Sequence, residues 1–292
     1  MKLSHKFALA AVSAAMLHGF ATAKTADVVV LMDESGSMAG EQAWIKAAVP
    51  VLDTGLGAAG VTDNRYGLIG FGASAAPAPS RVRSFSVAGG QFGTAGEFVT
   101  AAGGLVTTGS REDGWAAIVA ANAYTYRSGA VRNYILVTDE DRDDTFATNY
   151  EAMLGSLKAT NTLLNAVVNA NFKCGDGSAA IGVIGTTGYK ADGAGGFSTC
   201  SGAAWGGTDS GTTFDNYIKL ALDTGGGAWN LNILRSGGSN AESFTASFVD
   251  GKVGEIIIQP PPIPEPSTYA LLLGGLVVVG WAAQRRRISP AT

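Results

Sequence analysis

Continuous apolar runs that alternate with helical patterns constrain the fold of this chain more than any other feature. DVVVLM at 27–32, YGLIGF at 66–71 and NYILVT at 133–138 have the length of strands and lack a polar face, as strands covered on both sides do. Between them, residues 41–52 and 112–127 carry apolar residues at helical spacing. The same patterns predict helices at 148–159, 215–222 and 241–249, and strands at 81–87, 163–169 and 229–234. This alternation predicts an α/β fold with a doubly wound, mainly parallel central sheet flanked by helices.

The first 23 residues have the pattern of a secretory signal peptide. Lys2 and Lys6 give a positive start, an apolar stretch follows, and the segment ends in the small residues Ala-Thr-Ala, which is the usual order of such signals. We therefore expect the mature chain to begin near Lys24 and to face away from the cytoplasm.

The C-terminal end combines three elements in a fixed order. Pro264, Glu265 and Pro266 come first, an apolar segment at 267–284 follows, and three arginines open a basic tail at 285–292. An apolar segment with a basic stop is typical of an ordinary single-pass anchor with a cytoplasmic tail. The whole string PEPSTYALLLGGLVVVGWAAQRRR is a more specific pattern than a single-pass anchor requires, and it resembles a PEP-CTERM sorting tail.

This resemblance implies a cellular location. It implies a Gram-negative host in which an exosortase recognises the tail and cleaves it near Pro-Glu-Pro, after insertion into the membrane through 267–284. The protein would then reach the cell surface or the exopolysaccharide matrix. Residues 259–266 are rich in proline and are expected to form a stiff stalk that presents the cleavage site.

The composition of the remaining body excludes several classes of function. The chain has 20 Lys and Arg against 24 Asp and Glu; two basic residues lie in the signal, and three basic and one acidic residue lie from Glu265 onward, which leaves 15 against 23. Such an acidic body is a poor partner for nucleic acid or an anionic membrane. Both histidines, His5 and His18, lie in the signal. The mature chain therefore has no histidine for a Ser-His-Asp or Cys-His system or for a His-ligated zinc site.

Cys174 and Cys200 are the only cysteines of the chain. An even pair in an exported protein predicts one disulfide, with a pair of free thiols as the alternative. A metal site would need more ligands than these two. The bond would close a Gly-rich insertion that we place at 171–213 in the body, near the carboxyl edge of the sheet.

The motif with the most chemistry is Asp33-Glu34-Ser35-Gly36-Ser37, directly after the first apolar strand. Asp139 directly follows the strand at 133–138, and ligands of such sheets bind outside the carboxyl ends of strands. Carboxylate and hydroxyl oxygens at alternate positions of a tight turn suit one hard cation. These residues resemble the metal-ion-dependent adhesion site of von Willebrand factor A (vWA) domains, whose first motif is Asp-x-Ser-x-Ser. Thr224-Gly225-Gly226 resembles another motif of that family, and the resemblance covers residues 24–258.

Several residues are candidates for the third element of the expected site. The family supplies a threonine from a loop that follows a Gly-Gly pair, and this region reads AAGGLVTTGSREDGWAAI here. Thr107, Thr108 and Ser110 are all candidates; we favour Ser110, with Glu112 as an added carboxylate ligand. An N-cap role for Ser110 at the following helix competes with this interpretation.

A second departure from the family pattern follows Asp139, where Thr138-Asp139-Glu140-Asp141 replaces Thr-Asp-Gly. The acidic run is either a solvated loop or a second site for a cation such as calcium.

The resemblance implies a binding protein rather than an enzyme. Mg²⁺ or Ca²⁺ held by Asp33, Ser35, Ser37, the Ser110 and Glu112 loop and Asp139 would keep one position open for an oxygen of a protein or exopolysaccharide matrix ligand. A matrix protein in which the cation only stabilises the fold is the main alternative. A metal-assisted hydrolase is a weaker one, since the only general bases near the motif are Glu34, Glu112 and Glu140.

Overall fold

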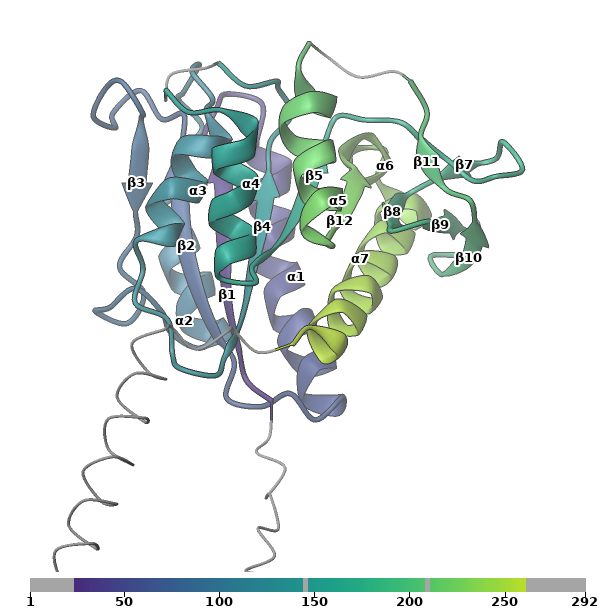
Figure 1. The fold of residues 1–292 in the computed structure, drawn as a ribbon, viewed down its shortest axis with the longest axis horizontal. Coiled ribbons are helices and arrows are strands. Elements are labelled where there is room, and N and C mark those ends of the chain that lie inside the picture. Colours follow the sequence, from purple (N-terminus) through teal and green to yellow (C-terminus); the bar gives the residue numbers. More distant parts are fainter. Residues whose placement is uncertain (1–23, 144–146, 208–210, 261–292) are drawn as a thin grey trace, which may run out of the picture.

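The central sheet has the predicted doubly wound architecture. The computed structural model describes residues 24–143, 147–207 and 211–260. Its main sheet has nine strands in the order β10-β9-β8-β12-β5-β4-β1-β2-β3, with helices on both faces (Figure 1). The core strands are β1 (Ala26–Asp33), β2 (Arg65–Phe71), β4 (Val131–Val137), β5 (Leu163–Val168) and β12 (Gly227–Asn230), and each pairs in parallel with its neighbour in this group. β3 (Val82–Ser84), within the strand expected at 81–87, closes one edge in antiparallel orientation.

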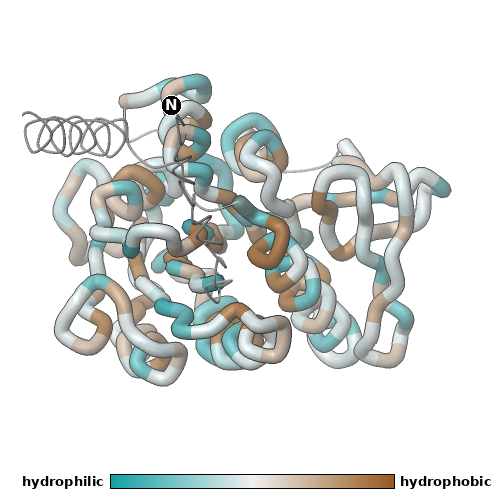
Figure 2. The backbone as a smooth tube through the Cα atoms, turned by 60° about the horizontal axis from the view of Figure 1, so that its bottom comes forward, coloured by the Kyte–Doolittle hydropathy of each residue, from teal (hydrophilic) through white to brown (hydrophobic). Residues whose placement is uncertain are grey.

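Two apolar layers separate the sheet from its helices. Val28, Val30 and Met32 of β1 face one layer, while Val29 and Leu31 face the other, and all are fully buried. The first layer is covered by α1 (Ala39–Ala58), α2 (Ala95–Ala102), α6 (Leu231–Arg235) and α7 (Gly238–Ile258). The second is covered by α3 (Gly114–Asn122), α4 (Tyr150–Ala159) and a π-helical turn, η1 (Phe214–Ile218), that continues into α5 (Lys219–Thr224). Figure 2 shows the resulting alternation of hydrophobic and hydrophilic residues along the helices around the sheet.

Several predicted elements differ from the structure at their ends, and one helix was not predicted. The strand expected at 229–234 ends at Asn230, whose side chain accepts a hydrogen bond from the Asn232 amide and thereby starts α6. The helix expected at 112–127 spans only Gly114–Asn122, and its N-cap is Asp113 rather than Ser110. The sequence interpretation missed α2, although a capping box of Thr94 and Glu97 precedes it.

The Gly-rich insertion is not the loop that we expected, because it forms strands. β8 (Gly182–Ile184), β9 (Thr187–Ala191) and β10 (Phe197–Ser201) extend the main sheet beyond β12 in antiparallel pairs. β6 (Phe172–Lys173), β7 (Ala179–Ala180) and β11 (Ala204–Trp205) make a small second sheet. The predicted Cys174–Cys200 disulfide is present and joins the two parts of the insertion.

The two terminal segments interpreted from the sequence lie mainly outside the described residues. These are the signal peptide at 1–23 and, except for Gln259 and Pro260, the stalk with Pro264, Glu265 and Pro266, the apolar segment at 267–284 and the basic tail. Within 24–143, 147–207 and 211–260, no helix has the length and apolar character needed to cross a membrane.

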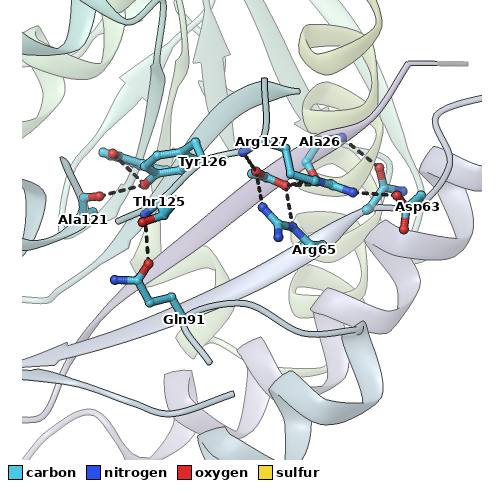
Figure 3. A network of polar contacts seen from close by, with 11 residues as sticks. Ala26, Asp63, Arg65, Gln91, Ala121, Thr125, Tyr126 and Arg127 are labelled. Carbon is cyan, nitrogen blue, oxygen red and sulfur yellow. Dashed lines mark hydrogen bonds and ion pairs between the residues drawn. The ribbon is translucent and has the colours of Figure 1, made fainter. Parts of the chain in front are cut away.

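A buried ion network fixes the amino end of β1 (Figure 3). The carboxylate of Asp27 is fully buried and lies 2.7 Å from Arg65 and 2.6 Å from Arg127. Arg127 also pairs with the exposed Asp63 at 2.7 Å. Burial alone would raise the pKa of Asp27, but hydrogen bonds from Arg65 and Arg127 outweigh it and hold the pKa below its usual value. The ionised carboxylate thus joins β1, β2 and the segment before β4.

We expect Asp27→Asn to lower the free energy of unfolding by about 3 kcal/mol, because it leaves two arginines facing a buried neutral group. Asp63→Asn, which removes the exposed partner of the same arginine, should cost less than about 1 kcal/mol. Since the folded-state pKa of Asp27 is lowered, its contribution is present above the unfolded pKa of about 4 and is lost as pH falls below that value. Urea unfolding of both variants at neutral and acidic pH checks this, and equal losses for the two would contradict it.

Candidate metal centre

The strand order brings the two predicted aspartates to one edge of the sheet. β1 and β4 are parallel neighbours in which Met32 pairs with Val137. Asp33 and Asp139 therefore follow adjacent strands at their carboxyl ends, where an open α/β sheet binds ligands.

The segment Asp33 to Ser37 forms a compact turn. Oδ1 of the fully buried Asp33 accepts a hydrogen bond from the Ser35 amide at 2.7 Å. The Ser35 and Ser37 hydroxyls lie 3.3 Å apart. Oδ2 of Asp33 accepts from the Thr138 hydroxyl at 2.7 Å, so the residue before Asp139 orients the first carboxylate. The three predicted ligands of this motif are brought together.

Glu34, the variable position of the motif, holds the next loop in place. Its buried side chain pairs with Arg83 at 2.5 Å and accepts from the Val106 amide at 2.9 Å. Its carbonyl oxygen accepts from the amides of Thr108 and Gly109 at 3.1 and 3.0 Å. The loop with the candidate hydroxyls therefore lies directly beside the DESGS turn, and the Glu34 carboxylate is already committed to a cation and an amide.

Glu112 is the buried member of that loop. A Cβ placed on Gly72 would lie 3.3 Å from Cγ of Glu112 and 3.5 Å from Oδ1 of Asp33, so the two side chains flank the same glycine. Oε2 of Glu112 is buried without a hydrogen-bond partner in the described part of the chain. Thr107 is half-buried, while Thr108 and Ser110 are exposed.

Asp139 has a cationic neighbour that the sequence interpretation missed. Oδ2 of Asp139 pairs with Nη2 of Arg235 at 2.8 Å, and Nε of the same guanidinium pairs with the buried Glu41 at 2.6 Å. Oδ1 of Asp139 is buried without a partner in the described residues. Arg235 ends α6, directly after the short strand β12. Its charge beside the last predicted strand was the available signal.

The acidic residues that follow Asp139 tie neighbouring loops together. Asp143 accepts a hydrogen bond from the Glu112 amide at 2.8 Å, and Asp141 accepts from the Thr212 amide at 3.1 Å. Arg142 pairs with Asp113 at 2.8 Å. The carboxylates of Asp141 and Asp143 therefore hold neighbouring loops together by hydrogen bonds.

Burial makes the carboxylates of Asp33 and Glu112 hard to ionise. It raises the pKa of Asp33 to about 7, although the Thr138 and Ser35 hydrogen bonds act against the shift. Burial, with the charges of Asp33 and Glu140 nearby, raises the pKa of Glu112 to about 8. Buried carboxylates with unpartnered oxygens fit a cation with oxygen ligands. In the described segments no three His, Cys, Asp or Glu residues form a metal-binding group, so a site here needs the serine hydroxyls as well.

Comparison with protein families identifies the tail. Residues 262–287 match the PEP-CTERM protein-sorting motif. The chain carries a PEP-CTERM sorting signal. This confirms the predicted tail and marks the chain as an exported surface protein that an exosortase processes. A search of curated proteins finds no match.

Matches to solved structures include two proteins of low sequence identity. One is a von Willebrand factor type A protein from Catenulispora acidiphila, with 17% identity and a TM-score of 0.36 over 50% of this chain and 33% of that one. The other is the pilus adhesin SpaC from Lactobacillus rhamnosus GG, with 14% identity and a TM-score of 0.48 over 81% of this chain and 31% of that one. The chain spans about a third of the length of these proteins.

In a chelating buffer, we expect the melting temperature to fall by roughly 5 °C between about pH 5 and pH 8. The folded-state pKa values of Asp33 and Glu112 are raised, so in this window the folded chain binds more protons than the unfolded chain, and stability declines as pH rises. Glu112→Gln should flatten the decline. Calorimetry of both proteins across this pH range checks the prediction. A variant whose melting temperature falls with pH as much as that of the parent would contradict a raised pKa of Glu112.

Proposed function

We propose that this protein is a cation-dependent binding module on the surface of a Gram-negative bacterium. The observation that supports the proposal is the turn formed by Asp33, Ser35 and Ser37, with Glu112 beside Asp33. Glu112 and Asp139 each have a buried oxygen without a partner in the described residues. Mg²⁺ or Ca²⁺ would be the cofactor. The ligand would be a protein or an exopolysaccharide of the matrix.

The donor set explains why binding suits the site. A hard cation prefers oxygen ligands and tolerates a mixture of carboxylates and hydroxyls. Ser37 and Ser110 are exposed, so that side of the centre is accessible to an oxygen of a partner. The cation would act as the electrophile that binds this partner oxygen, and the residues of the chain would hold the cation in position.

The position of the site also supports a surface role. The side chain of Lys24 donates to the carbonyl oxygens of Ile257 and Gln259 at 2.6 and 2.5 Å. The first residue of the expected mature chain therefore meets the end of α7 and the first residue of the stalk near the amino end of β1. Asp33 lies at the other end of that strand, so the site faces away from the point where the tail leaves the body.

Enzymatic use is not part of the proposal. The general bases weighed from the sequence are Glu34, Glu112 and Glu140, and Glu34 is already paired with Arg83. The body between the signal and the tail has no histidine. Turnover of an ester or glycan that is lost in Glu112→Ala would support a metal-assisted hydrolase instead.

Asp33→Ala should weaken cation-dependent binding to the matrix of the producing organism more than about tenfold, because it removes the central carboxylate of the site. The measurement is retention of purified protein on isolated matrix with Mg²⁺, with Ca²⁺ and with chelator, beside a calorimetric titration of each metal alone. Asp63→Ala, at an exposed carboxylate near the other end of the sheet, is the matched control and should bind as the parent does.

The same assay separates binding from a purely stabilising cation. If chelation lowers the melting temperature but leaves matrix retention unchanged, the cation supports the fold and the binding proposal is wrong. Loss of retention in chelator from protein that remains folded supports it.

We expect Arg235→Gln to tighten binding of the metal itself by roughly fivefold, about 1 kcal/mol, because it removes a positive charge from Asp139 and Glu41. Arg235→Lys keeps the charge and should stay within about twofold of the parent. Calorimetric titration of both variants with Mg²⁺ and Ca²⁺ checks this, and weaker binding in Arg235→Gln would show that the guanidinium mainly orients Asp139.

A further inference from the structure

A second cluster of reactive side chains lies far along the chain from the DESGS motif, in the core beneath α7. Lys252 of α7 is completely buried, and its Nζ directly contacts Oδ1 of Asn133 on β4. Nζ also lies 3.0 Å from Oε2 of Glu255, one turn along the same helix. Lys252 and Asn133 are 119 residues apart in the sequence, so only the fold brings them together.

The neighbours of this cluster hold each group in place. Nδ2 of Asn133 donates to Oε1 of Gln259 at 2.5 Å, which fixes the orientation of the amide. Oε2 of Glu255 accepts from Nδ2 of Asn165 at 2.8 Å. Oε1 of Glu255 is buried without a partner in the described residues. The asparagine carbonyl thus faces the amine, and one carboxylate oxygen remains available for a proton.

Burial also favours the reactive protonation states. It lowers the pKa of Lys252, and the attraction of Glu255 only partly opposes this. It raises the pKa of Glu255, against the opposing effect of Lys252. Away from water, an ammonium and a carboxylate are therefore biased toward a neutral amine and a carboxylic acid. A neutral amine is a nucleophile, and a carboxylic acid beside it can relay protons.

We propose that Lys252 and Asn133 form an intramolecular isopeptide bond, with Glu255 as the proton relay. Nζ of the neutral lysine attacks Cγ of Asn133, and the carbonyl electron pair moves onto Oδ1. Glu255 donates its proton to Nδ2 and takes one from Nζ. The Cγ–Nδ2 bond breaks, the carbonyl re-forms and ammonia leaves. One N–C bond replaces another, so the reaction needs no oxidant or cofactor and regenerates Glu255.

Placement in a rigid core supplies what this reaction lacks in solution. Primary amides resist attack by amines in water, and holding both groups in contact converts the encounter into an intramolecular step. Asn133 belongs to a strand that is paired on both sides, and Lys252 belongs to a 21-residue helix packed on that sheet. The cross-link would join α7 covalently to β4, the strand that precedes Asp139.

The test is a mass measurement on the purified, reduced and denatured protein. We expect a mass lower than that of the processed sequence by one ammonia. Trypsin cleaves after Arg132 and Arg142, so residues 133–142 should be recovered joined to a peptide in which Lys252 remains uncleaved. Recovery of 133–142 as a free peptide, with Asn133 intact or converted to aspartate, would overturn the proposal.

Variants separate the bond from an ordinary buried ion pair. Glu255→Gln keeps the shape of the relay without its proton transfer, and should slow formation of the linked peptide roughly a hundredfold. Asn165→Ala, which removes a neighbour of Glu255 but none of the reacting atoms, should retain the link. Linked peptide at the parent level in Glu255→Gln would contradict the role of Glu255. Because the bond forms only in the folded core, linkage is compared only among variants that circular dichroism shows to be folded.

Discussion

Strand β1 is the element on which the rest of the structure depends. All eight of its residues are buried, and it pairs in parallel with β2 on one side and β4 on the other. A parallel strand in this position requires apolar layers above and below it, which α1 and α3 help to provide. Its amino end is neutralised by the Asp27 network and its carboxyl end delivers Asp33. The two ends therefore stabilise a buried carboxylate in different ways. Arginines pair with Asp27, whereas a hydroxyl and an amide donate hydrogen bonds to Asp33.

The difference between these two aspartates supports the functional proposal. Two guanidinium groups lower the pKa of Asp27, whereas burial raises the pKa of Asp33, whose hydrogen-bond partners in the described residues include no cation. Arginine is present at the candidate site, but Arg83 pairs with Glu34 and Arg235 with Glu41 and Asp139. The arginines thus compensate the surrounding carboxylates, and no ion pair to Asp33 or Glu112 is present in the described part of the chain.

The core strands and the positions of Asp33 and Asp139 could be predicted from the sequence because burial on both faces leaves an unbroken apolar run. The order of β-strands in the insertion could not, since its strands are short and their glycines mask the period-two pattern. The start of α3 was misplaced because Ser110 and Asp113 are both good caps, and the choice depends on Asp113 meeting the Trp115 amide. Arg235 and Glu41 were missed for a different reason: their pairing joins residues 194 positions apart, which no local pattern encodes.

The contact of Lys24 with Ile257 and Gln259 has a mechanical consequence. A load applied at residue 260 first reaches the final turn of α7, where Lys24 and Gln259 fasten that turn to the starts of β1 and β4. A pull from this end and a counter-pull at the Asp33 edge would run along the strands. The hydrogen bonds between parallel strands would then be loaded together, in shear, rather than opened one after another. A body arranged in this way resists extension along the axis from its tail to its candidate binding edge.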